Sequence, residues 1–158
     1  MAFEGRFVIM EKTAIMIMDD PIFGVGLNNN TAVKKLRFKP DPKFEGEDGY
    51  PVHNHYLVVW SEVGFVGLVL QLAMFYLLLK QAWVLTRSDD RLVRTFAVAA
   101  FISFLAVYIH LLGDHFSRNA QRSLFFFFAG TVMATHALSR REGRADDDAL
   151  RRPSGGAN

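Results

Sequence analysis

The chain has no cysteine and very little net charge, and both absences narrow the possibilities. Without a thiol it can form neither a disulfide bond nor a thiolate metal site, although this says nothing about its compartment. A net charge of +2, without a basic stripe interleaved with aromatic residues, argues against a nucleic-acid partner. Internal repeats are absent as well, so the hydrophobic residues are the main guide to the fold.

Apolar residues make up 51% of the chain and collect in long blocks, with the charges between the blocks and at the end. This distribution predicts an all-α, polytopic membrane protein with an interfacial helix and three transmembrane helices. The spans are expected at residues 57–79, 95–113 and 123–138, with lengths of about 34, 28 and 24 Å. The third is short for a hydrocarbon core of about 30 Å and would need tilt or snorkelling.

The segments outside these spans are polar. Residues 7–18 have the apolar content of a helix but are too few to span, and Asp19, Asp20 and Pro21 end the pattern, so we expect an interfacial helix within a polar region covering residues 1–56. Residues 139–158 are rich in Arg, Asp, Gly and Ser and are predicted to form a disordered tail. A long polar region before the first span is typical of the C-terminal part of a larger polytopic protein.

Basic residues near the span ends predict the orientation. The side that holds the C-terminus has many of them, namely Lys80, Arg87, Arg91, Arg94, Arg140, Arg141, Arg144, Arg151 and Arg152. The other side has only Lys43, Arg118 and Arg122 close to a span. Because basic residues are retained in the cytoplasm, we expect the C-terminus to be cytoplasmic and the loop that holds His53 to face outward.

Ionisable side chains stand at the start of the first predicted span: His53, His55 and Glu62. Such groups cost several kcal/mol in lipid unless they face protein or water, which makes them candidates for function. The alternative is structural, because a histidine at a helix start can also cap backbone groups or lie among lipid headgroups. Their spacing relative to nearby glycines helps to decide between the two interpretations.

His53 and Asn54 are followed by nine residues, then Gly64, two residues and Gly67. Upstream, Pro21-Ile-Phe-Gly24-Val-Gly26 forms a turn motif, and Arg6 precedes the predicted interfacial helix. Together these features resemble the O-antigen ligase and polymerase family of bacterial envelope glycosyltransferases, over about residues 6–79. Gly64 and Gly67 also have a simpler interpretation, since small residues let membrane helices approach closely.

The resemblance implies a function at the outer face of the bacterial inner membrane. It implies inverting transfer of a glycan from an undecaprenyl diphosphate carrier, without a metal or cofactor, to lipid A-core or another glycan or protein acceptor. Ligases, O-antigen or exopolysaccharide polymerases and protein O-oligosaccharyltransferases share the motif, so these alternatives remain open. Family members have several times as many spans, which leaves two further alternatives: a companion chain that supplies the missing spans, or a noncatalytic membrane fragment of a split or truncated protein.

The chemistry that the resemblance implies suggests roles for particular residues. We expect His53 to take the proton of the acceptor hydroxyl, because an imidazole titrates near neutrality. We expect Arg6 to bind the diphosphate, because its guanidinium offers a fixed fork of donors. Arg118 and Arg122 are weaker candidates for the same task, since their turn faces the same side.

Three further features need an interpretation. Asn54 is a candidate substrate ligand. Glu62 is expected to be a buried polar group that supports the site without contacting the substrate. His110 and Asp114 stand four apart with His115 adjacent, which resembles a metal site, but we expect a hydrogen bond between His110 and Asp114 instead. The basic residues between 34 and 43 are interpreted as a solvated loop or as a contact to acidic phosphates.

Overall fold

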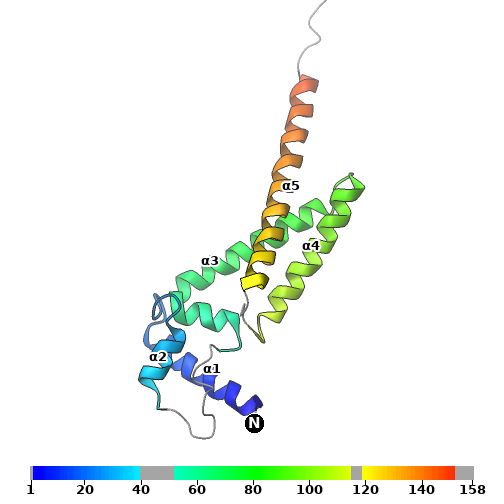
Figure 1. Cartoon of the computed structure of the whole chain (residues 1–158). Coiled ribbons are helices and arrows are strands. Elements are labelled where there is room, and N and C mark those ends of the chain that lie inside the picture. Colours follow the sequence, from blue (N-terminus) through cyan, green and yellow to red (C-terminus); the bar gives the residue numbers. More distant parts are fainter. Residues whose placement is uncertain (1, 40–51, 115–118, 152–158) are drawn as a thin grey trace, which may run out of the picture.

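The computed structural model describes residues 2–39, 52–114 and 119–151. Within these residues the protein is entirely helical and contains no strand, which confirms the predicted all-α class. The helices, in chain order, are α1 (Ala2–Asp19), α2 (Asn30–Arg37), α3 (His55–Leu85), α4 (Arg91–His110) and α5 (Asn119–Arg151) (Figure 1).

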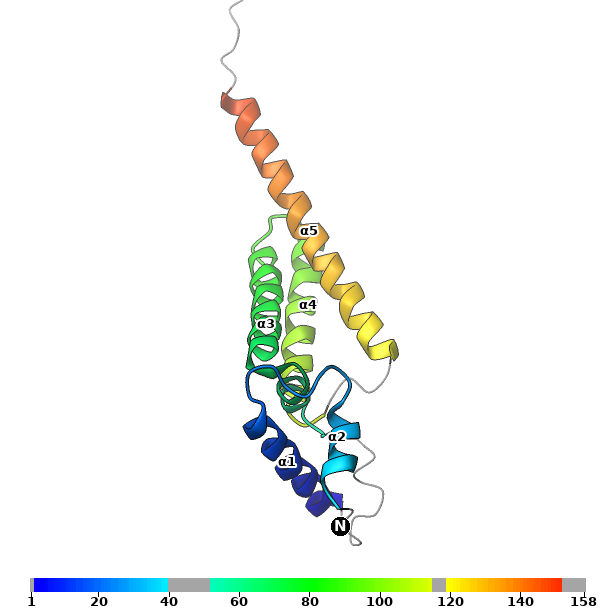
Figure 2. The ribbon, with the colours of Figure 1, turned by 90° about the vertical axis from the view of Figure 1, so that its left-hand side faces the viewer.

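Two of the helices form an antiparallel pair of membrane length. α3 and α4 run side by side and are joined by a turn at residues 86–90 (Figures 1 and 2). Among the described residues, only these two helices are long and apolar enough to cross a membrane. The third predicted span lies in α5 and is not confirmed, since Gly130, Thr131 and His136 dilute its apolar stretch.

α5 is much longer than the predicted third span and extends away from the other helices (Figure 1). It continues to Arg151, whereas the sequence predicted a disordered tail from Ser139. Elongation of an existing helix needs no new nucleus, so a polar sequence can continue it without packing against a core. Residues 152–158 lie outside the described part of the chain.

α3 is broken at Gly64, where the backbone adopts φ 69° and ψ −173°. These angles belong to a region that is essentially restricted to glycine. The helix after the break, residues 65–85, is about 31 Å long and can cross a membrane alone. The candidate span covers the whole of α3 from His55 to Leu85, and the break separates its first turns from the rest, so the predicted start at Leu57 remains a prediction.

The loop at residues 21–26 docks into this break. It exchanges three backbone hydrogen bonds with α3: Val25 N to Ser61 O at 2.8 Å, Gly26 N to Glu62 O at 2.9 Å and Phe65 N to Pro21 O at 2.8 Å. A Cβ atom on Gly64 would lie 1.9 Å from Ile22 O, and one on Gly24 would lie 2.7 Å from Gly64 N. The glycines thus allow a loop to approach α3, where the sequence suggested the approach of another helix.

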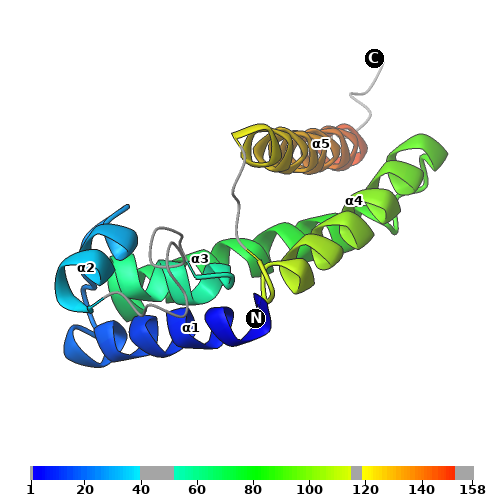
Figure 3. The ribbon, with the colours of Figure 1, turned by 60° about the horizontal axis from the view of Figure 1, so that its bottom comes forward.

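α1 and α2 lie beside the first part of α3 (Figure 3). α1 confirms the predicted helix at residues 7–18 and is longer at its N-terminal end; it buries Ile9, Thr13 and Met16. α2 falls where the sequence predicted a continuous loop, and its Lys34 is fully buried rather than solvated. The other described cations of this segment, Lys35, Arg37 and Lys39, are exposed.

Aromatic rings hold the three longer helices together. Phe75 on α3 stacks on Tyr108 of α4, with ring centroids 4.1 Å apart. Phe125 on α5 meets Phe75 edge-on at 5.9 Å and Phe104 edge-on at 5.5 Å. The Tyr56 hydroxyl donates a 2.8 Å bond to Tyr108 O, which ties the first turn of α3 to the last turns of α4.

Candidate functional site

Asn54 joins the start of α3 to the end of α4. Its side-chain oxygen caps α3 by accepting a 3.1 Å bond from Leu57 N. Its side-chain nitrogen donates a 2.9 Å bond to Leu112 O, just after α4. Capping satisfies an otherwise unpaired backbone donor, so the amide of Asn54 has a structural task at both ends.

His55 strengthens the same junction. Its backbone N–H donates to Leu111 O and to Asp114 O, each at 2.9 Å. Its ring nitrogen Nε2 lies 2.5 Å from the side-chain nitrogen of Gln71, which belongs to α3 after the break. His55 therefore connects both parts of α3 to the end of α4, two residues after His53.

His53 faces a carboxylate at this junction. Its Nδ1 lies 3.6 Å from Asp114 Oδ1, and Nε2 of His110 lies 3.7 Å from Asp114 Oδ2. The side chains of His53 and Asp114 are about one-third exposed, at 31% and 39%, whereas His110 is 66% exposed. We call His53, Asp114 and His110 the imidazole–carboxylate cluster. The carboxylate thus lies between the two imidazoles, with one oxygen toward each.

The sequence analysis paired Asp114 with His110 but missed its contact with His53. A signal for this contact exists in the predicted topology. Consecutive spans run in opposite directions, so the start of one and the end of the next lie on the same side of the membrane. His53 and Asp114 occupy those two positions.

Glu62 lies at the break in α3. One of its carboxylate oxygens accepts a 3.3 Å bond from Asn30 N, at the start of α2. The Asn30 side chain donates a 2.7 Å bond to the hydroxyl of buried Ser61. Glu62 is about 12 Å farther along α3 than Asn54. Its observed contact therefore anchors α2, and its predicted support of His53 remains a prediction.

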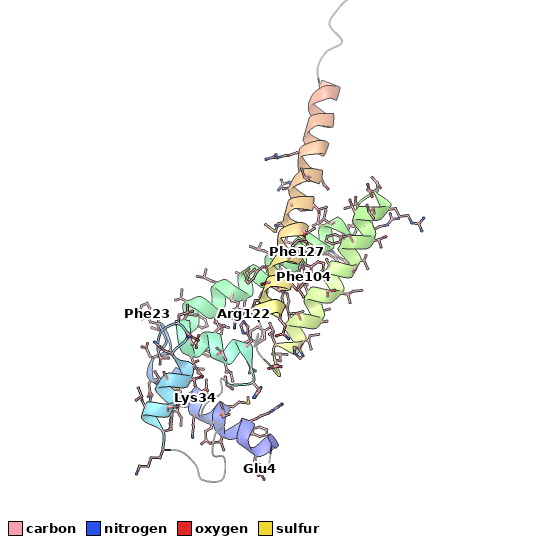
Figure 4. All side chains as sticks on the ribbon, in the orientation of Figure 1. Glu4, Phe23, Lys34, Phe104, Arg122 and Phe127 are labelled. Atoms are coloured by element: carbon pink, nitrogen blue, oxygen red, sulfur yellow. The ribbon has the colours of Figure 1, made fainter. Side chains whose placement is uncertain are left out.

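The predicted phosphate ligands are placed differently. Arg6 is exposed on α1 and, among the described residues, forms no hydrogen bond or ion pair. Arg122 is exposed on the first turns of α5 (Figure 4). Arg118 lies outside the described residues. No contact in the described part of the chain brings these arginines to His53, so their roles remain predictions.

A cavity of about 490 Å³ opens between α4 and α5. Most of its lining is apolar, with Phe96, Phe104 and Phe128 among the contributors. His110 and Gln121 also line it, so one end of the cavity meets the imidazole–carboxylate cluster. Within the described ranges, no group of three His, Asp or Glu side chains is arranged to hold a metal ion.

Comparison with known proteins finds a family match for the first part of the chain. Residues 1–72 match the family model described as O-antigen ligase. No curated protein and no solved structure matches the chain. The matched segment includes Arg6, the docked loop, His53 and the break at Gly64. Residues 1–72 are therefore similar to the O-antigen ligase family, and this similarity, together with two apolar helices of membrane length, indicates a membrane protein.

Proposed function

We propose that this chain takes part in glycan transfer from an undecaprenyl diphosphate carrier to an acceptor hydroxyl at the periplasmic face of the bacterial inner membrane. The acceptor would be lipid A-core, another glycan or a protein. The family match supports a ligase- or polymerase-like role in general. The observation that carries the specific proposal is that His53, inside the matched segment, faces Asp114 at the junction of α3 and α4.

In the proposed reaction His53 is the general base. Because Nδ1 faces the carboxylate, a proton on Nδ1 is favoured and Nε2 carries the lone pair. Nε2 takes the proton of the acceptor hydroxyl as its oxygen attacks the anomeric carbon of the donor sugar. The bond from that carbon to the diphosphate oxygen breaks, and the lipid diphosphate leaves with both electrons.

The negative charge that develops on the leaving diphosphate requires cationic partners. We assign this task to Arg6, with Arg118 and Arg122 as supporting ligands, because a guanidinium matches phosphate oxygens with two parallel donors. Asn54 is assigned the positioning of His53, since its amide bonds both helices, with substrate contact as a second role. Glu62 is assigned support of the first part of α3.

Large apolar side chains remain exposed on all three longer helices, including Leu70 (65%), Ile102 (60%) and Phe127 (67%). Lipid covers such residues in a membrane, and so do further helices. We infer that a companion chain supplies additional spans. The alternative is that the chain is a noncatalytic membrane fragment, and the activity test below distinguishes the two.

The orientation of the chain can be tested directly, because the absence of cysteine allows single-cysteine variants. We expect Leu27→Cys, which replaces a residue 76% exposed beside α2, to react with a membrane-impermeant thiol reagent in intact spheroplasts. Arg87→Cys, in the turn between α3 and α4, should react only after lysis. The reverse pattern would show that the His53 side is cytoplasmic and would exclude periplasmic transfer.

The catalytic assignment is tested in membranes of cells in which a variant replaces the natural chain, so that any companion is present. His53→Ala should insert and fold normally but lower glycan transfer by about 10²- to 10⁴-fold, the usual loss for a general base. Arg6→Lys should also lower transfer, because an ammonium keeps the charge but loses the fork geometry. His136→Ala is the matched control, since it removes a half-buried histidine of α5 and should leave transfer unchanged.

Two results would contradict the proposal. Near-normal transfer by His53→Ala would return His53 to a structural role at the helix junction. Absence of transfer by the natural chain, with its membranes intact and a lipid diphosphate glycan supplied, would favour the noncatalytic fragment.

A further inference from the structure

A second cavity, of about 200 Å³, lies where α5 passes the turn between α3 and α4 (Figure 2). Its polar lining residues are Arg87 and Ser88, in the turn after α3, and His136, Ser139 and Arg140 of α5. We call this cavity the basic pocket. It is at the opposite end of the α3–α4 pair from the imidazole–carboxylate cluster, because α3 begins and α4 ends beside that cluster.

Two arginines from separate elements converge on the basic pocket. The guanidinium of Arg87 lies over the ring of Trp83, 5.6 Å from its centroid, which restrains a long side chain at this place. Arg140 forms no hydrogen bond or ion pair with any described residue. Basic residues at span ends help to orient a chain in the membrane, but that role does not require them to share a pocket. The convergence therefore indicates a binding site for an anion.

Two hydroxyl groups accompany the arginines. Ser88 Oγ accepts a 3.3 Å bond from Asp90 N, so its own proton is available to a ligand. The half-buried Ser139 forms no side-chain hydrogen bond with the described residues. The acidic residues of the turn, Asp89 and Asp90, do not line the pocket, and Asp90 caps α4. Two guanidinium groups and two hydroxyls suit a phosphate, which accepts bonds from several directions.

The basic pocket lies at the level expected for lipid headgroups. Its apolar lining residues, Val84 and Leu85, belong to the last turn of the membrane-length helix α3. Trp83 is exposed in the same turn, and tryptophan is enriched at the boundary between membrane and water. Val84 and, on α5, Leu138 are exposed beside the pocket. A ligand can therefore place a polar head among the arginines and an apolar part in the bilayer.

We propose that the basic pocket binds the phosphate of an anionic phospholipid. Arg87 and Arg140 supply charge-assisted bonds to the phosphate oxygens, and the hydroxyls of Ser88 and Ser139 donate to the same group. At about 200 Å³ the pocket is smaller than the range of about 300 to 1,000 Å³ usual for drug-sized ligands, so it admits a headgroup and leaves the acyl chains in the bilayer. The headgroup should carry no ammonium, because the arginines would repel a further cation.

An acidic segment of a companion chain is less well suited to these observations. Its carboxylates could reach the guanidinium groups, but it would leave the exposed Val84 and Leu138 without an apolar partner, whereas acyl chains cover them. Basic pockets between membrane helices also bind anionic headgroups in other membrane proteins. The proposal goes beyond glycan transfer and does not depend on it, since the pocket and His53 are at opposite ends of the α3–α4 pair.

The test uses photoreactive phosphatidylglycerol in membranes that contain the full chain and any companion. In the natural protein we expect the label to map to the turn after α3 and to the middle of α5. The double variant Arg87→Gln/Arg140→Gln removes both exposed cations of the pocket and should lower this labelling at least about tenfold, a loss equivalent to about 1.4 kcal/mol of binding. Arg91→Gln/Arg141→Gln is the matched control: it removes two exposed arginines that lie outside the pocket, at the start of α4 and next to Arg140, and its labelling should be unchanged.

Four results would overturn the proposal. Equal losses of label in the two double variants would show that the general positive charge of this region, and not the pocket, holds the lipid. Equal labelling of the natural protein by photoreactive phosphatidylcholine would show that the pocket does not select an anionic headgroup. Displacement of the label by inorganic phosphate, but not by chloride of equal ionic strength, would identify free phosphate as the occupant. Absence of label from the natural protein would assign the pocket to another occupant, such as an acidic segment of a companion chain; the last three results do not depend on a variant that folds.

Discussion

The two sides of the break in α3 are built by different means. Before Gly64, α1, the docked loop, α2 and the first turns of α3 are joined by backbone hydrogen bonds and by close contacts at glycines. After it, the rest of α3 packs with α4 and α5 through aromatic rings, and a cavity of about 490 Å³ remains. We call the first the tight side, because close backbone contacts join it, and the second the loose side, because its side-chain packing leaves a cavity.

The difference follows from what each side has to do. A broken helix frees backbone groups that find no partner in lipid, each at a cost of several kcal/mol, so the loop at residues 21–26 must satisfy them. The same bonds fix the docked loop against residues 61–65 of α3. The packing of α3 with α4 and α5 relies on apolar contacts, which need less precision because dispersion is not directional.

The largest effect is expected from Gly64→Ala. Its Cβ would lie 1.9 Å from Ile22 O, and its backbone angles are strained for any residue with a side chain, which alone costs about 1–3 kcal/mol. We expect the loop to leave the break and the yield of folded protein to fall sharply. Thermal unfolding in detergent, followed by circular dichroism, measures this loss.

The control for this prediction comes from the other side of the break. A Cβ at Gly130 in α5 meets nothing within 4 Å, so Gly130→Ala should be neutral or stabilise the helix by about 0.5–1 kcal/mol. If both variants unfolded at the temperature of the natural protein, the docked loop would not be a structural requirement. If Gly130→Ala were the more damaging, the contrast between the tight and the loose side would be wrong.

Much of the fold could be predicted from hydropathy alone. The helix within α1 and the apolar pair α3 and α4 follow from the distribution of apolar residues. The break in α3 could not be predicted this way, because the apolar residues Val63 and Phe65 directly flank Gly64, and the strain is visible only in its backbone angles. α2 was missed because a short helix depends on tertiary contacts, here those of Asn30 with Ser61 and Glu62.

The candidate site around His53 could also be predicted only in part from the sequence. Spacing selected His53 and Asn54 as candidates, and their roles remain predictions, whereas the family match at residues 1–72 confirms the resemblance on which they rest. It did not identify Asp114 as a partner of His53, because Asp114 lies 3.6 Å away in space but beyond α4 in the sequence. The cavity between α4 and α5 could not be predicted for a related reason: the space left between two helices depends on how their side chains pack.

Asp114→Asn gives a smaller effect, on rate rather than on folding. The substitution keeps the shape and removes the charge that faces Nδ1 of His53, while the bond from His55 N to the backbone oxygen of residue 114 is retained. We therefore expect normal folding, an unchanged KM and a fall in kcat of about 10- to 100-fold, which is less than the loss expected when the base itself is removed.

Asp19→Asn is the matched control, since it removes an exposed carboxylate that pairs with Arg37. It should change stability by less than about 1 kcal/mol and should leave glycan transfer unchanged. A raised KM with unchanged kcat would move Asp114 from orienting His53 to binding substrate, and equal rates for Asp114→Asn and the natural protein would leave the contact between the two helix ends without a catalytic role.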